Sequence, residues 1–235
     1  MGYDKHQATH EFTRWSESYD RSILQWLLFG PSHRAIIGKI KAEFGGRPIR
    51  VLDVGCGTGV FAARIRRALP EARVWGIDLV AGMLAKGAER WSRHADGVLP
   101  VQADSERLPF GRGAFDVVTC ANSFHHYPHQ DRAVGEMRRV LRPGGRLILV
   151  DGYRDRPYGW LIYDVCVAHV EGSVHHASAA RIRDLFRAAG FGDVAQKVHR
   201  GFAPFLLSEA VAPALGRAVP APHFAGDRAP MTREI

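Results

Sequence analysis

The chain has 235 residues, of which 46% are apolar and 24% charged, and its formal net charge is +8. This length and composition suit one sizeable α/β domain with room for an appendage. No apolar stretch approaches the ~20 residues that span a bilayer, and the N-terminus lacks the apolar core of a secretory signal. We therefore expect a cytoplasmic protein with no membrane partner.

Charge, cysteine and histidine usage argue against several further classes. Arginine supplies 27 of the 32 basic residues, spread along helical stretches such as 64–69 beside apolar stripes. This pattern indicates solvated helix faces rather than a nucleic-acid surface. The three cysteines lie far apart without a C-x-x-C pair, which excludes a disulfide framework and a cysteine-rich zinc site. The twelve histidines show no H-E-x-x-H spacing, so we predict no metal.

Residues 1–33 are rich in aromatics and are predicted to form a helical cap. Apolar residues recur at helical spacing on one face of this segment. Pro31 is predicted to interrupt the helix, and a second helix is expected over 33–44, ending at Gly45 and Gly46.

From residue 49 strands and helices alternate. The predicted strands cover 49–54, 73–78, 98–104, 115–121 and 146–151, and the helices between them cover 60–69, 81–91 and 131–141. This alternation predicts a mostly parallel sheet with helices on both faces. Ligands on such sheets bind at the carboxyl ends of the strands, where Asp53, Asp78 and Asp104 lie.

After Asp151 the alternation lapses over residues 152–177. A helix over 178–190 follows, and then two strand-like segments, 193–200 and 204–212, that predict an antiparallel hairpin. We therefore expect a main domain over 34–211 with an inserted acceptor-site segment at 152–177, and a loosely ordered tail over 212–235.

A glycine turn follows the first strand, in the stretch VLDVGCGTG from Val51 to Gly59. Its glycines form G-x-G-x-G, and Val60 stands where a dinucleotide fingerprint has its third glycine. Asp53 would be poorly placed beside a pyrophosphate but useful beside a cationic ligand, or it supports the turn. The turn alone does not choose the ligand.

Five segments together resemble one family. These segments are VLDVGCGTG, GID at Asp78, QADSERLPF, FDVVTCANSFHHYPH and EMRRVLRPGGRLILVDG. With them the chain resembles, over residues 12–210, the class I S-adenosylmethionine (SAM)-dependent methyltransferases, particularly the ubiquinone/menaquinone-biosynthesis-type, methyltransferase domain 11-like branch. RPGG, within the last segment, is interpreted as a structural turn.

The resemblance implies a Rossmann-like α/β fold, with a seven-stranded mixed sheet in the order 3-2-1-4-5-7-6 and an antiparallel strand seven. It implies SAM as cofactor, with Asp78 accepting the ribose hydroxyls, Asp104 the adenine amine, and Leu79 and Met83 flanking the ring. The implied cofactor-binding residues are Tyr19, Asp53, Gly55, Cys56, Gly57, Asp78, Leu79, Met83, Ala103, Asp104, Ser105 and Asn122. For the acids a cap or loop role stays open, for Cys56 a small buried side chain, and for Tyr19 core packing.

The implied function is methyl transfer to a small molecule on oxygen, nitrogen or carbon. ANSFHHYP lacks the Asn/Asp-Pro-Pro-aromatic motif of enzymes that methylate nucleic-acid bases, so no nucleic-acid partner is expected. The alternatives are a non-catalytic SAM-binding partner protein and an NAD-dependent oxidoreductase. We expect a monomer or homodimer. One of His126, His175 and His176 is predicted to take the acceptor's proton or to orient the acceptor.

Overall fold

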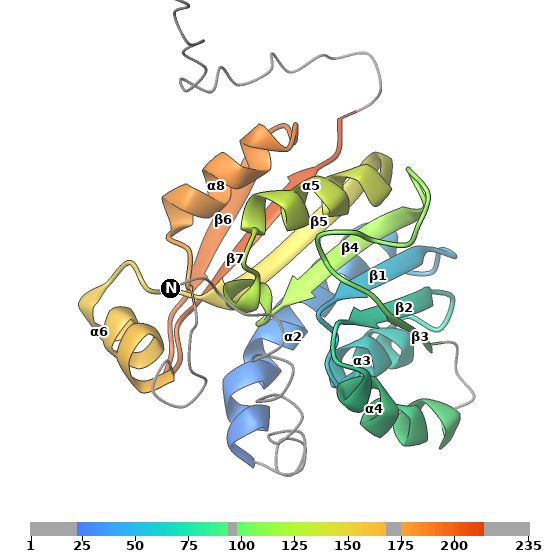
Figure 1. The fold of residues 1–235 in the computed structure, drawn as a ribbon, viewed down its shortest axis with the longest axis horizontal. Coiled ribbons are helices and arrows are strands. Elements are labelled where there is room, and N and C mark those ends of the chain that lie inside the picture. Colours follow the sequence, from blue (N-terminus) through green and yellow to red (C-terminus); the bar gives the residue numbers. More distant parts are fainter. Residues whose placement is uncertain (1–22, 94–97, 168–174, 214–235) are drawn as a thin grey trace, which may run out of the picture.

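The computed structural model describes residues 23–93, 98–167 and 175–213, and Tyr19, predicted to touch the cofactor, lies outside them. Seven strands form one sheet in the order β3-β2-β1-β4-β5-β7-β6 (Figure 1). They are β1 (Arg50–Val54), β2 (Arg73–Asp78), β3 (Val98–Gln102), β4 (Phe115–Ala121), β5 (Leu141–Gly152), β6 (Val194–His199) and β7 (Phe205–Val211).

The predicted strand order and directions are confirmed. The pairs among β1 to β5 are parallel, whereas β7 runs antiparallel to both β5 and β6. The first five strands therefore end at one common edge of the sheet, which the turns after β1, β2, β4 and β5 share.

Helices cover both faces. On one side lie α2 (Ile23–Phe44), α3 (Val60–Ala68) and α4 (Ala81–Arg93); on the other lie α5 (Gln130–Val140) and α8 (Ala179–Ala188) (Figure 1). Successive strand residues alternate between the two cores. Val117 and Ile148 pack with α2 and α3, and Val118 and Leu149 pack with α5 and α8. Because both faces of each strand are buried against helices, apolar residues are needed at successive positions, and the strands are continuous apolar runs in the sequence.

Two sequence expectations about element boundaries are wrong. The helix α2 runs through Pro31 without interruption, although a proline removes one backbone hydrogen bond. Ile36 and Ile40, on its later turns, are completely buried in the core, and that packing outweighs the missing bond. β3 ends at Gln102, short of the predicted Asp104, which lies in a bridge with Arg107.

The segment RPGG has a structural role, as predicted, although it forms the start of β5 and not a turn before it. Gly144 has a φ of +73°. A Cβ on Gly145 would lie 2.9 Å from the Arg142 carbonyl oxygen and 3.0 Å from that of Asp116. Two backbones therefore approach here more closely than any larger residue allows.

The inserted segment contains α6 (Pro157–Trp160) and the π-helical η2 (Leu161–Val167). Within the described residues, no helix is long and apolar enough to cross a membrane.

Candidate functional site

The glycine turn links β1 to α3 at the carboxyl edge of the sheet. Gly55, Gly57 and Gly59 have φ values of 74°, 55° and 70°, and Gly59 caps the first turn of α3. The N–H groups of Gly55 and Cys56 both donate to the Ile77 carbonyl, at 2.9 and 2.8 Å. The turn is therefore fastened to β2, and three left-handed positions explain its glycines.

Gly55 and Gly57 are glycines for different reasons. A Cβ on Gly55 would lie 2.4 Å from the Ser123 hydroxyl oxygen and 2.6 Å from that of Tyr127, so this position is filled by protein. A Cβ on Gly57 would meet no atom of the described residues within 4 Å. The open side of the turn is therefore at Gly57, where a ligand has room.

Asp78, the last residue of β2, holds this open part of the turn. Its Oδ2 accepts the Gly57 N–H at 2.8 Å, and its Oδ1 accepts the Val80 N–H at 2.9 Å. Burial raises the pKa of this carboxyl, and the backbone N–H donors of Val80, Gly57 and Leu79 partly offset the increase. Each carboxylate oxygen has a further lone pair, so Asp78 can still accept hydroxyl groups of a ligand.

Asp53 is buried beneath the turn, on the face covered by α2 and α3. Its Oδ1 accepts the Thr119 hydroxyl at 2.9 Å. Burial raises the pKa of Asp53 to about 7; the Thr119 hydroxyl opposes this, and the charge of Asp78 adds to it. The Asp53 carboxyl therefore links β1 to β4 through Thr119. A nearby cation would stabilise its ionised form.

The remaining predicted cofactor residues follow neighbouring strands. The Ala103 N–H donates to the Asp78 carbonyl, and Asp104 Oδ1 accepts the Glu106 N–H in a local turn. Leu79 is 39% exposed, whereas Met83 on α4 is buried.

Cys56 is a small buried side chain, as predicted, and burial raises the pKa of its thiol. A Cβ on Gly76 would lie 2.9 Å from its sulfur, so the thiol packs against β2. Ser105 is half-buried just after Asp104. Asn122 follows β4 with a left-handed φ of 56°, and its Nδ2 donates to the Ser32 hydroxyl on α2.

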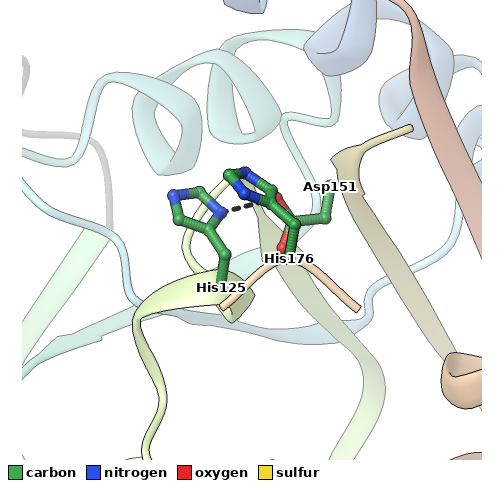
Figure 2. A group of neighbouring side chains, drawn as sticks. All are labelled: His125, Asp151 and His176. Atoms are coloured by element: carbon green, nitrogen blue, oxygen red, sulfur yellow. Dashed lines mark hydrogen bonds and ion pairs between the residues drawn. The ribbon is translucent and has the colours of Figure 1, made fainter. Parts of the chain in front are cut away.

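A second group of polar side chains lies at the ends of β4 and β5. His125 and His126 come from the short η1 helix (Phe124–His126), Asp151 from β5, and His176 from the segment before α8. We call these four residues the histidine cluster. His125, Asp151 and His176 are buried side by side (Figure 2). The His125 Nδ1 lies 2.6 Å from Asp151 Oδ1.

The imidazole rings of this cluster pack on one another. The His125 ring stacks on that of His176, with centroids 4.3 Å apart and planes 20° apart, and it lies 4.1 Å from the His126 ring. Burial strongly lowers the pKa of His126, and the charges of His125 and His176 add to this, whereas the charge of Asp151 opposes it; the net shift is downward, so His126 is neutral near pH 7. His175 is exposed, and its backbone N–H donates to the His125 carbonyl.

His125 and Asp151 are missing from the residues predicted from sequence. His125 and His126 are adjacent, and nothing in the sequence tells which of them points to β5. Asp151 is the last residue of a predicted strand, as Asp78 is, and that position pointed to the same edge of the sheet.

Among the described residues, His125, Asp151 and His176 also have the composition of a metal-ligand set, with ligand atoms within 4.8 Å of one another. The ring geometry opposes a shared ion. The lone pair of an imidazole nitrogen lies in the plane of its ring. The rings of His125 and His176 are nearly parallel with centroids 4.3 Å apart, so their lone pairs lie in two separate planes. A tetrahedral or octahedral ion ~2.1 Å from each nitrogen needs lone pairs that converge.

By sequence, residues 51–145 match the model of a family described as a methyltransferase domain. The chain is 39% identical over 104 residues to the demethylmenaquinone methyltransferase of Thermus thermophilus, covering 44% of this chain and 47% of that protein. It is 36% identical over 169 residues to a ubiquinone/menaquinone biosynthesis C-methyltransferase of Bordetella avium, covering 62% of this chain and 65% of that protein. The chain thus spans about half to two thirds of the length of these curated relatives.

Comparison by structure finds the same fold. Magnesium protoporphyrin IX methyltransferase from Synechocystis superposes with a TM-score of 0.72 at 18% identity, covering 88% of this chain and 99% of that one. A possible histamine N-methyltransferase from Thermotoga maritima superposes with a TM-score of 0.67 at 20% identity, covering 86% of this chain and 99% of that one. These similarities confirm the predicted fold class.

Proposed function

We propose that this chain is a class I SAM-dependent methyltransferase that transfers a methyl group from SAM to a small-molecule acceptor; residues 51–145 match a methyltransferase domain, and the fold matches that of a solved methyltransferase. The observation that carries the proposal is the open side of the glycine turn at Gly57, held by the Asp78 carboxylate at 2.8 Å. A left-handed glycine that no other described residue crowds, beside a strand-end carboxylate, is suited to a ligand that presents hydroxyl groups to the backbone.

The predicted cofactor residues fit SAM chemically. SAM carries ribose hydroxyls for Asp78, an adenine amine for Asp104, and cationic groups but no phosphate. A carboxylate such as Asp53 below the turn favours a cationic ligand over a pyrophosphate. Leu79 follows β2, Met83 lies on α4, and Ala103 and Ser105 follow β3. Asn122 and Tyr19 complete the proposed set.

SAM supplies a methyl group already activated as a sulfonium. The protein's own part is to align the acceptor, to exclude water and to take a proton where the acceptor loses one. Alignment of the two reactants contributes several kcal/mol to such reactions. The candidate histidines are His126, His175 and His176, at the carboxyl edge of β4 and β5, where the acceptor must approach the methyl group.

The acceptor class follows from the relatives and from the inserted segment. Two relatives are named for menaquinone or ubiquinone biosynthesis, so hydroquinones are the first acceptors to test. The segment 152–177 supplies aromatic side chains beside the histidine cluster, such as Tyr163, whose ring centroid lies 5.1 Å from that of His176. We propose a protein of the cytoplasm, monomeric or dimeric, without a nucleic-acid or membrane partner.

The test has two stages. Calorimetry compares SAM, S-adenosylhomocysteine and NAD; tighter binding of NAD would overturn the proposal in favour of an oxidoreductase. Labelled SAM is then incubated with hydroquinones, phenols, amines and carboxylates, and product mass identifies the methylated atom. Binding of SAM without any methylated product would instead support a non-catalytic SAM-binding partner protein.

A further inference from the structure

The histidine cluster contains a buried carboxylate that is only partly satisfied. Asp151 Oδ1 lies 2.6 Å from His125 Nδ1 and accepts the Gly152 N–H at 2.9 Å. Its Oδ2 is buried and makes no hydrogen bond to any described residue. Buried polar atoms in folded proteins almost always have partners, so this oxygen can accept a hydrogen bond from a further polar group, such as a water molecule or a bound ligand.

Asp151 is ionised. Burial would raise its pKa, but the charge and hydrogen bond of His125 and the charge of His176 lower it below the ordinary value. An ionised carboxylate only accepts hydrogen bonds, so in the neutral form of His125, the form that can act as a base, the proton lies on Nδ1. The other ring nitrogen, Nε2, then carries the lone pair. A carboxylate at Nδ1 also stabilises the imidazolium that forms when Nε2 takes a proton.

The ring of His125 is held from several sides. The rings of His176 and His126 pack against it, and the His125 carbonyl accepts the His175 N–H at 2.8 Å. Gln130 ties the same two segments together by donating to the carbonyls of Phe124 and His175. A base needs this kind of fixed orientation to act on a bound acceptor.

The glycine turn lies directly beside the η1 helix. The Ser123 hydroxyl donates to the Val54 carbonyl at 3.2 Å and lies 3.1 Å from the Tyr127 hydroxyl. Both hydroxyls occupy the space that a Cβ on Gly55 would need. The residues that flank His125 on both sides therefore contact the turn at which the methyl donor is proposed to bind.

From these contacts we infer that His125 is the general base of the reaction and that Asp151 is its positioning residue, an inference that rests on the proposed methyl transfer. The acceptor's nucleophilic atom uses its electron pair to form a bond to the methyl carbon. The carbon–sulfur bond breaks, and its pair stays on sulfur, giving S-adenosylhomocysteine. The proton of the acceptor moves to His125 Nε2, and the positive charge passes from the sulfonium to an imidazolium paired with Asp151.

This role specifies the substrate class. The acceptor loses a proton as it is methylated, as a phenol, a hydroquinone, an alcohol or an ammonium does. A carboxylate needs no base, and the cluster gives it no advantage. Among the described residues, the titratable groups in contact with His125 include Asp151 from β5, His126 from its own helix and His176 from the segment before α8; Tyr163 from η2 lies behind His176.

The test distinguishes a general base from a positioning residue, and both from a residue with a purely structural role. His125→Asn keeps an amide N–H for Asp151 but has no counterpart of Nε2, so it should fold and bind S-adenosylhomocysteine normally. Its kcat should fall roughly 10²–10⁴-fold with the acceptor that the wild type methylates fastest. The deficit should shrink with a more acidic acceptor of the same class, such as a nitrophenol already ionised at pH 8 instead of phenol, because no proton remains to be removed.

Asp151→Asn should lower kcat and move the acidic limb of its pH profile to lower pH, since the imidazole becomes a weaker proton acceptor without the carboxylate. The control is His129→Gln, an exposed histidine three residues beyond His126, which should leave kcat and the profile unchanged.

Three outcomes would overturn the inference. The first is a His125→Asn enzyme with near-normal kcat, or one whose deficit is the same for both acceptors. The second is a large loss in His126→Ala alone, which would assign the base to His126. The third is turnover that requires an added divalent cation and is abolished by a chelator. If the wild type methylates no acceptor at all, the proposed function itself fails, which is a different result from these three.

Discussion

The two glycines of the turn provide the most direct test of how the structure separates packing from ligand binding. Both have left-handed φ values, 74° at Gly55 and 55° at Gly57. An L-residue in this conformation costs about 1–2 kcal/mol. Gly57→Ala adds only this strain, because its Cβ would enter open space. We expect it to reduce the free energy of unfolding by about 1–2 kcal/mol.

Gly55→Ala should cost more, because its Cβ would also collide with Ser123 and Tyr127 at 2.4 and 2.6 Å. These hydroxyls are themselves hydrogen-bonded, so they cannot move away freely. Inserting a methyl group into filled space costs about 1–3 kcal/mol. The sum with the strain is about 2–5 kcal/mol. Urea denaturation followed by circular dichroism measures both variants, and equal losses would refute the assignment of Gly55 to packing.

Ligand affinity should show the opposite order. Gly57→Ala should weaken S-adenosylhomocysteine by tenfold or more, about 1.4 kcal/mol, because its methyl group occupies the ligand's side of the turn. The matched control is Gly144→Ala, with a φ of 73° and no atom within 4 Å of its Cβ, at the opposite end of β5. It should lose the same stability as Gly57→Ala and keep full affinity in calorimetry. Unchanged affinity in Gly57→Ala would refute a ligand at this position.

Three further variants test the site and its support. Asp78→Ala should weaken SAM by roughly 1–3 kcal/mol in calorimetry through lost ribose hydrogen bonds, and equal affinity would contradict that role. Because burial raises the pKa of Asp53 to about 7, its ionisation opposes folding: stability from this group is complete below pH 4 and is lost as pH rises through 7. Asp53→Asn should therefore match the wild type at pH 4 and exceed it at pH 8, by up to roughly 4 kcal/mol in urea titrations; equal stability at pH 8 would argue against the shift. Ser178→Ala removes the side chain that accepts the Arg181 N–H at the start of α8 and should cost about 0.5–2 kcal/mol, measured by urea denaturation; no loss would show that the cap is replaced.

The sequence by itself determined the local features of this protein. Alternating apolar runs and helical stripes located the strands and helices of the sheet, and the resemblance of five segments supplied the strand order that was confirmed. Glycine spacing located the turn, and the end of the second strand located Asp78. These properties depend on short stretches of chain, where periodicity and turn chemistry act directly.

Only the tertiary structure decided which of these residues meet. Helix α2 continues through Pro31 because of what its later turns pack against, which the local sequence does not contain. Gly55 and Gly57 are alike in the sequence and differ only in what lies opposite them. His125 reaches Asp151, 26 residues away, because β4 and β5 are neighbours that end at one edge. The direction of one side chain depends on contacts between distant segments, and no periodicity within a segment specifies it.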